Sequence, residues 1–396
     1  MISYKYKLYN NQKWNKKLHD LCRSAAFVWN HCLALQQRYY KLYKAYIPVY
    51  RMQAHFAKKV TPNNEFLKLM GSQSIQEIIK RLDTSYQRFF KKTQKRPPKF
   101  KSGFSFSSFV FKQAGFSLSD NAIHINKLKH SFKFFKSRAF GKPKNVRLKR
   151  DKLGDFHLII TSEEDVRNKS YGKTRNGASV GIDFGLKTYL TMSDGSVETA
   201  PLFFNKNIKQ IRNLHKNLSK KQRVKTGKQK FNKRFGKMVD VTKLSNNGEK
   251  ARKNLVRAYR KLTNKRTDYQ YKLAHQLCRK YEYIFAETLN LDGMKRLWGR
   301  KVSDLCHASF ISKLKEVAGK YDVVFHQIDQ WYASSKTCSS CGHKHGDLTL
   351  KDRTFVCPEC GTEIDRDFNA SLNILRQGFV EYLSSRQTTL AVADCA

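Results

Sequence analysis

Four cysteines near the C-terminus form the most specific chemical pattern in the sequence. Cys338 and Cys341 lie in TCSSCG, and Cys357 and Cys360 lie in VCPECG, with fifteen residues between the two pairs. Each pair can supply two thiolates, and two pairs complete a tetrahedron around a zinc ion. Because protein ligands fill all four positions, we expect a structural zinc ion that folds a short module lacking its own core.

Acidic residues in three separate segments form a second, dispersed pattern. Asp183 stands in SVGIDF, Glu287 in IFAETL, and Asp365 and Asp367 in DRDFN. An acid at a strand end is most often a turn or cap residue, but an unpaired carboxylate within an apolar strand is unfavourable. Taken together, the acids could hold two divalent metal ions for phosphodiester hydrolysis. Oxygen ligands favour Mg²⁺ or Mn²⁺ over zinc.

The two aspartates of DRDFN have different expected roles. Asp365 falls where an N-cap belongs, because a helical run starts directly after it. Asp367 lies in the first turn and could aim a carboxylate at Asp183 and Glu287. An apolar stripe should dock this helix on a sheet; it consists of Phe368, Leu372, Leu375 and Phe379.

The charge of the chain indicates a polyanionic partner. Lys and Arg number 78 against 31 acids, which gives a formal net charge of +47 in 396 residues. A folded domain does not need this charge, because self-repulsion destabilises the compact state. Nucleic acid fits better than a membrane surface, since no amphipathic basic anchor is present and no apolar run is long enough to span a bilayer. The N-terminus has no apolar signal region, and the scattered cysteines fit a reducing cytoplasm.

The elements of the N-terminal half change in character near residue 100. Residues 2–9 alternate as a strand should, and helices are expected at 13–46 and 72–92, the second ended by the prolines of RPPKF. Short alternating segments from 100 to 165 indicate a small β-barrel or sandwich. Four phenylalanines there fit the barrel core better than base stacking; they are Phe104, Phe106, Phe109 and Phe111.

The C-terminal half predicts a different fold. Residues 179–200 read as three short strands, and 205–280 carries 25 basic residues against three acids in stretches expected to be helical and to line a groove. A buried strand at 283–289, a helix, another strand, the cysteines and a closing helix follow. This order is the ribonuclease H pattern, which would place the first aspartate on the first strand.

Several motifs carry a clear family resemblance. They are GIDFGLK, ETLNLDGM, QWYASSKTCSSCG, VCPECG and DRDFNASLNI, with SYQRFFKK and RPPKFKS further upstream. The sequence resembles TnpB, the family of RNA-guided DNA endonucleases of insertion sequences also known as OrfB-type transposases, to which type V CRISPR effectors and Fanzor proteins are related. By position, the resemblance implies that the catalytic, Mg²⁺-binding acids are Asp183, Glu287 and Asp367.

The resemblance also implies a multidomain α+β architecture. A wedge-like N-terminal β-barrel would be interrupted by a helical recognition lobe, and an RNase H-like RuvC nuclease domain would carry an inserted zinc module. The implied boundaries are 1–10 and 96–165 for the wedge, 11–95 for the lobe, 166–178 for a linker, 179–335 and 363–380 for the nuclease, 336–362 for the zinc module, and 381–396 for a disordered tail.

The function implied is cleavage of double-stranded DNA beside a short motif, directed by a transposon-derived guide RNA (omega RNA). We expect a two-metal phosphodiester hydrolase with catalytic Mg²⁺ and structural zinc, a monomer in its ribonucleoprotein, acting in the prokaryotic cytoplasm at the nucleoid. Gln and Lys suit base edges, so the candidate motif readers, for which a capping turn is the alternative, are Lys68, Ser72, Gln73 and Gln76.

Three other functions compete with this prediction. A non-cleaving RNA-guided regulator would have a broken acid triad, and this triad is complete. A transposase using the same fold would join DNA ends without a guide RNA. A compact type V CRISPR effector would differ mainly in its genomic neighbourhood.

Overall fold

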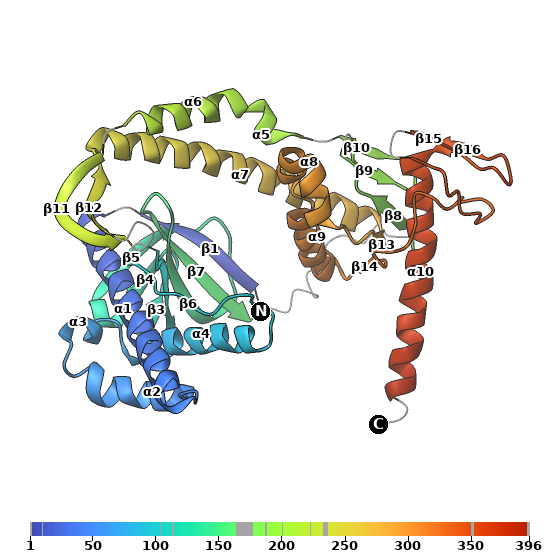
Figure 1. The fold of residues 1–396 in the computed structure, drawn as a ribbon. Coiled ribbons are helices and arrows are strands. Elements are labelled where there is room, and N and C mark those ends of the chain that lie inside the picture. The colour runs from blue at the N-terminus through green and yellow to red at the C-terminus, as the bar shows by residue number, and fades with distance from the viewer. Residues whose placement is uncertain are drawn as a thin grey trace. The chain divides into compact units, whose positions relative to one another are not determined.

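The computed structural model divides into two compact units, Met1–Asp165 and Val166–Ala396 (Figure 1). The residues that it describes are 2–9, 11–103, 105–112, 115–163, 177–186, 188–199, 201–221, 223–232, 237–349 and 352–393. Most of the predicted linker at 166–178 lies outside these residues. No helix in the described parts of the chain is long and apolar enough to cross a membrane.

The first unit contains one seven-stranded antiparallel sheet in the order β2-β6-β7-β1-β5-β4-β3. Its N-terminal strand β1 pairs with β7, so that Tyr6 faces Leu158, and with β5 on its other side. The strands are β1 (Ile2–Leu8), β2 (Ser108–Lys112), β3 (Phe116–Leu118), β4 (Ala122–Ile125), β5 (His130–Phe135), β6 (Lys142–Arg150) and β7 (Phe156–Glu163). This nearly closed sheet corresponds to the predicted barrel.

Helices inserted between β1 and β2 complete the first unit. They are α1 (Gln12–Tyr43), α2 (Val49–His55) with a π-helical extension (Phe56–Val60), α3 (Glu65–Lys68) and α4 (Ser72–Phe90). The two long helices expected from periodicity are thereby confirmed. Gly71, with φ of 75°, starts α4 without a side-chain cap.

The helices and the sheet of the first unit share one hydrophobic core. Trp29 Nε1 on α1 donates to the Lys99 carbonyl at 3.0 Å, and Asn30 exchanges two 2.8 Å hydrogen bonds with the backbone of Lys101. Ser74 Oγ on α4 donates to the Val110 carbonyl on β2. The lobe and the wedge, expected as separate parts, therefore form one compact body.

Three of the four phenylalanines considered for base stacking are core residues. Phe106, Phe109 and Phe111 are at most 3% exposed, whereas Phe104 lies outside the described residues. Their burial in the shared core confirms the core interpretation for these three side chains.

The second unit is built on a five-stranded mixed sheet in the order β10-β9-β8-β13-β14. The strands β8, β9 and β10 form an antiparallel meander, and β13 and β14 run parallel to β8. Their bounds are β8 (Ser179–Asp183), β9 (Thr188–Met192), β10 (Val197–Thr199), β13 (Tyr283–Ala286) and β14 (Val324–Gln327). All five match segments that the sequence analysis assigned to strands.

The basic segment 205–280 is not helical throughout, which corrects one expectation. It holds α6 (Ile208–Ser219), the long α7 (Asn246–Lys280) and, between them, an antiparallel hairpin of β11 (Arg223–Asn232) and β12 (Lys237–Leu244). Alternating residues such as those of MVDVTKL favour a strand, and their dense lysines conceal this pattern. The other helices before the cysteines are α5 (Phe203–Lys206), α8 (Leu291–Leu305) and α9 (His307–Tyr321); α8 was not predicted.

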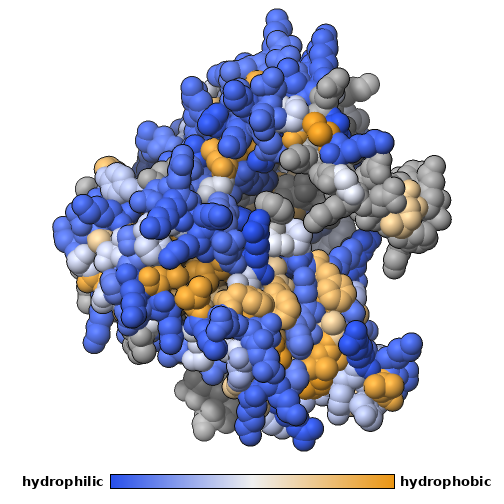
Figure 2. All heavy atoms as spheres, turned by 90° about the vertical axis from the view of Figure 1, so that its left-hand side faces the viewer, coloured by the Kyte–Doolittle hydropathy of each residue, from blue (hydrophilic) through white to orange (hydrophobic). Residues whose placement is uncertain are grey.

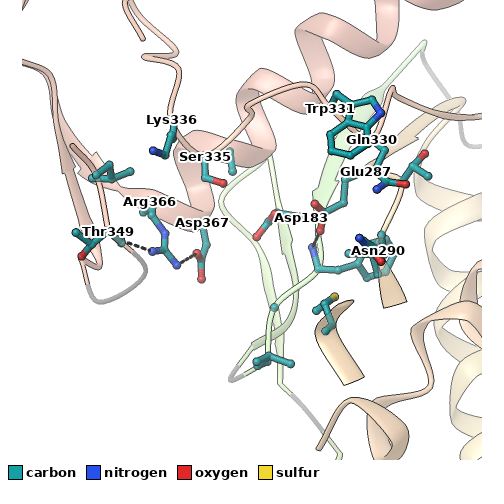
Figure 3. A pocket seen from close by; sticks show the side chains of 18 of the residues that line it. Asp183, Glu287, Asn290, Gln330, Trp331, Ser335, Lys336, Thr349, Arg366 and Asp367 are labelled. Atoms are coloured by element: carbon teal, nitrogen blue, oxygen red, sulfur yellow. Dashed lines mark hydrogen bonds and ion pairs between the residues drawn. The ribbon is translucent and has the colours of Figure 1, made fainter. Parts of the chain in front are cut away.

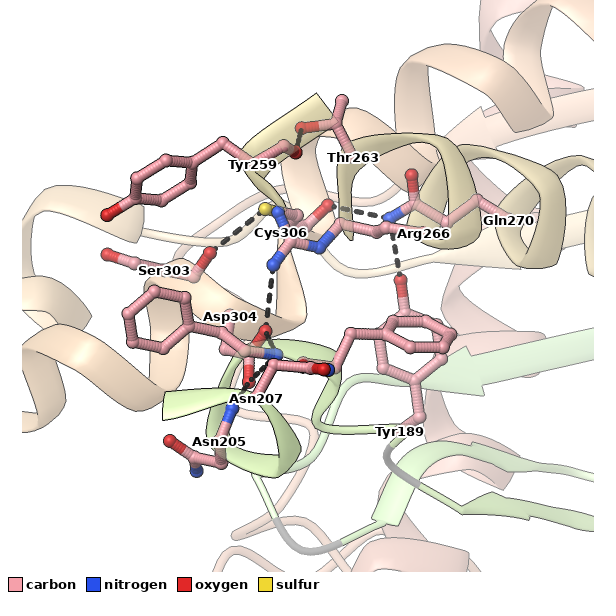
Figure 4. Close-up of polar contacts among 12 residues, drawn as sticks. Tyr189, Asn205, Asn207, Tyr259, Thr263, Arg266, Gln270, Ser303, Asp304 and Cys306 are labelled. Atoms are coloured by element: carbon pink, nitrogen blue, oxygen red, sulfur yellow. Dashed lines mark hydrogen bonds and ion pairs between the residues drawn. The ribbon is translucent and has the colours of Figure 1, made fainter. Parts of the chain in front are cut away.

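A buried charge pair ties three of these helices together (Figure 4). The Asp304 carboxylate near the end of α8 accepts a 2.7 Å bond from Arg266 on α7 and bonds of 2.9–3.1 Å from the backbone N–H groups of Phe204 and Asn205 on α5. The Asp304 side chain is 1% exposed. Charged donors satisfy a buried carboxylate best, so this contact fixes α5 and α8 against the basic helix.

The closing helix α10 (Arg366–Ala393) crosses the sheet at unusually short range. A Cβ added to Gly181 on β8 would lie 2.1 Å from the Ser371 carbonyl oxygen of α10, and one added to Gly378 would lie 2.3 Å from the Phe285 ring. Gly181 thus lets the strand contact the backbone of the helix, and Gly378 lets the helix backbone contact the Phe285 ring.

Two expectations for α10 need correction. The tail expected to be disordered from 381 onwards continues this helix to Ala393. The docking face also differs in part from the predicted stripe: Leu375 and Phe379 pack against the cluster around Phe285 as predicted, whereas Phe368 and Leu372 are partly buried outside that cluster. The fully buried positions of α10 include Ala370, Ser371 and Ile374, where small residues permit the close approach.

Replacing Gly181 with alanine should destabilise the second unit, because the new methyl group would collide with the α10 backbone. Overpacking of this kind lowers the free energy of unfolding by about 1–3 kcal/mol. Denaturant unfolding of the full chain measures the change. Gly319→Ala is the matched control: a Cβ at that exposed position of α9 meets no atom within 4 Å, so it should stabilise by up to about 1 kcal/mol. Equal effects of the two substitutions would contradict the close-packing interpretation.

Candidate active site and zinc centre

Two of the three predicted acids stand on adjacent parallel strands. Asp183 ends β8 and Glu287 directly follows β13, and the register pairs Ile182 with Ala286 just before them. The Phe184 N–H donates to Glu287 Oε1 at 3.2 Å. Because the carboxyl ends of parallel neighbours meet at one sheet edge, the two carboxylates are brought side by side.

Asp367 reaches the same place from the first turn of α10. Its carboxylate forms ion pairs with Arg366 at 3.3 Å and with Arg353 at 4.0 Å. The neighbouring Asp365 accepts a 2.9 Å hydrogen bond from the Phe368 N–H, which is the N-cap contact. Its predicted role as the cap of this helix is therefore confirmed, and the cap leaves Asp367 free to face the sheet.

The three acids line one pocket of about 510 Å³ in the second unit. In the view of Figure 3, Asp183 stands between Glu287 and Asp367. The pocket wall combines these acids with cations and polar groups, among them Asn290, Gln330, Trp331, Ser335, Lys336, Thr349, Arg353 and Arg366. A site with clustered carboxylates and nearby cations can bind metal ions and phosphate oxygens together.

Burial and mutual repulsion make the acid cluster unfavourable without a cation. Burial, followed by the Glu287 and Asp367 charges, raises the pKa of Asp183 well above its usual range. Burial also raises the pKa of Glu287 to about 7, with Asp367 adding to the rise and the Phe184 N–H opposing it. Divalent cations would relieve this repulsion, so the donor set fits an oxygen-liganded metal site.

The acid cluster is wider than a site for one compact ion. Among the described residues, only the four cysteines bring three or more candidate ligand atoms within 4.8 Å of one another. The carboxylates of Asp183, Glu287 and Asp367 line their pocket without converging that closely. This spread distinguishes the acid site from the thiolate site.

Replacing Glu287 with glutamine should stabilise the chain at alkaline pH in buffer free of Mg²⁺ and Mn²⁺. A carboxyl whose pKa is raised on folding binds its proton more tightly in the folded state, so stability falls as pH rises from its ordinary value of 4.5 through about 7. Glutamine removes this loss while keeping an acceptor for Phe184. The expected gain is about 1–3 kcal/mol at pH 8 and close to zero at pH 5. Thermal unfolding at both pH values tests this, and an equal shift at the two values would contradict it.

The four predicted zinc ligands come together in one cluster. Cys338 Sγ lies 3.7 Å from Cys360 Sγ, and Cys341 Sγ lies 3.6 Å from Cys357 Sγ. Each pair ends in a turn, and the two turns are of the same kind. The Gly342 N–H donates to the Cys338 carbonyl and the Gly361 N–H donates to the Cys357 carbonyl, each at 3.0 Å. Positive φ values of 81° and 70° at the two glycines explain the Cys-x2-Cys-Gly pattern. The cluster fits a tetrahedral zinc ion.

Two buried asparagines of α10 connect this zinc module to the acid site. Asn369 accepts from the Ser339 N–H at 2.9 Å and donates to the Thr337 carbonyl at 2.8 Å. Asn373, one turn later, donates to the carbonyls of Ser334 and Thr337. Both side chains are at most 1% exposed, so they hold the segment before the first cysteine pair rigidly against the helix that carries Asp367.

Sequence reasoning missed these two asparagines, although their signal was present. They lie four residues apart in FNASLNI, where an apolar helix face would normally carry hydrophobic side chains. Buried amides need several hydrogen-bond partners, and only a neighbouring loop with free backbone groups could supply them. The pair would have allowed a polar docking partner for α10 to be predicted.

Replacing Cys357 with serine should release zinc and loosen the module, because Cys357 is buried and hydroxyl is a poor zinc ligand. We expect less than one zinc per chain by elemental analysis and faster proteolysis within 336–362. Cys306→Ser is the control, since this thiol lies outside the cluster and bonds the Ser303 carbonyl, which a hydroxyl can also do. Full zinc content in the Cys357 variant would contradict the assignment.

The residues proposed to read a DNA motif lie in the first unit. Ser72 and Gln73 line a second pocket of about 210 Å³ beside Lys127 and Lys112. Lys68 and Gln76 are exposed but do not line it. Their role stays a prediction.

Three family models match the chain. Residues 160–297 match the OrfB (IS605) family described as a probable transposase, 307–374 match the Cas12f1-like TNB domain, and 1–45 match the OrfB helix-turn-helix domain. Together they cover more than half of the sequence. The chain therefore contains regions that match the OrfB (IS605) transposase family and the Cas12f1-like TNB domain. In residues 1–45, which match the helix-turn-helix domain, the structure shows β1 and the single long helix α1.

Two curated relatives align along most of their length, and a third aligns along less than half of its own. A protein of Streptomyces pristinaespiralis named as an RNA-guided DNA endonuclease is 26% identical over 95% of this chain and 89% of its own. The RNA-guided DNA endonuclease InsQ of Escherichia coli K12 is 24% identical over 95% and 92% of the two chains. The TnpB-like protein L79 of Acanthamoeba polyphaga mimivirus is 27% identical over 52% of this chain.

Solved structures share the fold at low sequence identity. The Cas12f1 chain in a complex with sgRNA and target DNA matches with a TM-score of 0.56 and 16% identity, covering 92% of this chain and 83% of its own. The mini-RNA-guided endonuclease CRISPR-Cas_phi3 matches with a TM-score of 0.51 and 11% identity over 95% and 92% of the chains. These two matches show that the chain shares its overall fold with the two effector chains.

Proposed function

We propose that this protein is an RNA-guided, Mg²⁺-dependent DNA endonuclease with an RNase H-like nuclease domain of the RuvC type. The observation that carries the proposal is the meeting of Asp183, Glu287 and Asp367 at one pocket from three distant segments. The names of the curated relatives support the same reaction. The sheet order, with an aspartate ending the first strand of the meander, supports the RuvC assignment.

The acid cluster is the proposed Mg²⁺ site, and its three carboxylates would hold two ions. When bound, Mg²⁺ supplies an activated water and stabilises the leaving oxygen of a phosphodiester. The carboxylate of Asp367 is oriented by Arg366, and the Phe184 N–H orients Glu287. Arg353 and Lys336 line the same wall and would attract the phosphates on either side of the bond to be cut.

The zinc module would shape the pocket without taking part in the chemistry. Its residues Leu348, Thr349 and Arg353 line the wall opposite the sheet, and Arg366 Nη1 donates to the Thr349 carbonyl at 3.2 Å. Because four thiolates would fill the coordination sphere of zinc, no position is left for substrate.

The positive charge supports nucleic-acid partners. Figure 2 shows a face covered mainly by hydrophilic residues, with smaller hydrophobic patches, and the net charge of the whole chain is +47. A transposon-derived guide RNA and a target duplex would neutralise this charge, with base pairing reading the target and the protein reading a short flanking motif. The proposed motif readers stay Lys68, Ser72, Gln73 and Gln76. One protein chain per ribonucleoprotein is proposed.

Two alternative functions make different predictions for the same molecule. A non-cleaving regulator would bind target DNA through its RNA but would not need a cluster of carboxylates in which the neighbouring acids raise the pKa of Asp183. A compact type V CRISPR effector would use the same acids with a guide RNA from a repeat array. The three acids favour cleavage over regulation. The source of the guide RNA distinguishes the proposed transposon-encoded nuclease from a CRISPR effector.

Replacing Asp183 with alanine should abolish cleavage and leave target binding intact. The full chain is expressed with its native flanking DNA, the copurified RNA is sequenced, and a duplex matching the variable RNA end is offered with Mg²⁺. We expect the wild type to cut and the variant to lose at least 10³-fold in rate, roughly the loss of a metal-held nucleophile. Asp194→Ala is the control, because this acid lies in the β9–β10 turn and pairs with Lys280. Surviving cleavage in the Asp183 variant, or bulk cellular RNA in the complex, would contradict the proposal.

A further inference from the structure

Trp331 is an exposed aromatic side chain on the wall of the acid pocket. It is 83% exposed, more than any other large hydrophobic residue among those that the structure describes. Figure 3 shows its indole beside Gln330 and close to Glu287. Exposed tryptophans on a concave site are typical of ligand contacts, because folding gains little from them.

The backbone that carries Trp331 is firmly held. The Ile328 N–H donates to the Ala286 carbonyl at 2.9 Å, and Thr288 Oγ1 donates to the Ile328 carbonyl at 2.7 Å. The Asp329 N–H donates to both Glu381 oxygens at 3.2 Å, and Asp329 Oδ1 accepts from the Trp331 N–H at 3.2 Å. The indole is thus presented from a fixed loop.

Glu381 is the anchor of this loop on α10. Besides Asp329, its carboxylate accepts from His326 Nε2 at 3.1 Å and from Gln377 Nε2 at 2.9 Å. These bonds lower the pKa of Glu381 against the effect of its burial. The position of Trp331 is therefore set by the same helix that sets Asp367.

No ring or cation among the described residues pairs with the Trp331 indole, although such contacts are common elsewhere in the described parts of the chain. Its two faces are therefore available to a ligand. Trp faces bind nucleobases by stacking, which tolerates any base sequence. Lys336 and Arg353, which line the same pocket, suit the phosphates that accompany a base.

We propose that Trp331 stacks on one nucleobase of the strand being cut and thereby fixes which phosphate lies over Asp183 and Glu287. This inference rests on the proposed nuclease function. It assigns Trp331 a substrate-positioning role that is separate from metal binding. Since stacking needs only a π-face, the site selects a position along the strand and not a base type.

The first test combines a protein substitution with a substrate change. Trp331→Ala, Trp331→Phe and the control Leu383→Ala, an exposed residue of α10 away from the pocket, are compared as full ribonucleoproteins. We expect kcat/KM to fall about tenfold for alanine and less for phenylalanine, within the roughly 5- to 150-fold range of base–aromatic stacking. Cut positions should scatter over neighbouring phosphates in the alanine variant, and the control should match the wild type.

An abasic nucleotide placed at each position around the cut identifies the stacked base. At one position it should lower kcat/KM of the wild type by about the same factor, and the alanine variant should lose nothing further there. A penalty that persists unchanged in Trp331→Ala, or wild-type kinetics and cut position in that variant, would overturn the proposal.

A binding measurement separates this proposal from the nuclease function itself. Single-stranded DNA with 2-aminopurine near the cut is bound to the Asp183→Ala ribonucleoprotein with and without Trp331→Ala. Stacking predicts quenched fluorescence that recovers at one position when Trp331 is removed, and identical fluorescence overturns it. If the wild type does not cut at all, the nuclease proposal fails while this fluorescence result still decides whether Trp331 stacks.

Discussion

The backbone contact between α10 and the sheet is the constraint on which the second unit depends. At Gly181 the strand that ends in Asp183 lies against the carbonyl of Ser371, with no room for a methyl group between them. Asp367 is one helical turn away from that contact. This contact fixes the distance between a strand and a helix that are separated by about 180 residues of sequence. Side-chain packing would fix the distance less closely, because side chains can change rotamer.

The acid site and the basic surface both lower the stability of the protein when their ligands are not bound. Burial and neighbouring acids raise the pKa of Asp183 and of Glu287, and the positive charges of the basic helices repel each other in the absence of a polyanion. Contacts such as Asp304 with Arg266 and the α5 backbone offset part of this strain. Charged ligands would therefore stabilise both the surface and the acid site of this protein.

Local chemistry in the sequence was sufficient for some of these features and not for others. The cysteine spacing, the cap at Asp365 and the strands that carry Asp183 and Glu287 each follow from a few neighbouring residues, so they could be predicted. The shared core of the first unit, the β11–β12 hairpin and the Asn369 and Asn373 contacts depend on partners far away in sequence. The periodicity of α10 overestimated the contribution of Phe368 and Leu372 to its docking on the sheet. A periodic pattern indicates amphipathicity, but it does not indicate the small residues that a close helix–sheet crossing requires.

The two asparagines of α10 also bear on how such proteins can be modified. Their partners are backbone carbonyls and an N–H group of residues 334–339, so what they recognise is the path of the main chain and not its side chains. A zinc module transplanted from a relative with a different sequence would still dock if its backbone followed the same path. One residue inserted between Ser334 and Thr337 would displace the Thr337 carbonyl, which accepts from both amides, and leave each of them short of a partner. The same two asparagines thus allow the sequence of the zinc module to change but restrict the length of the segment that precedes it.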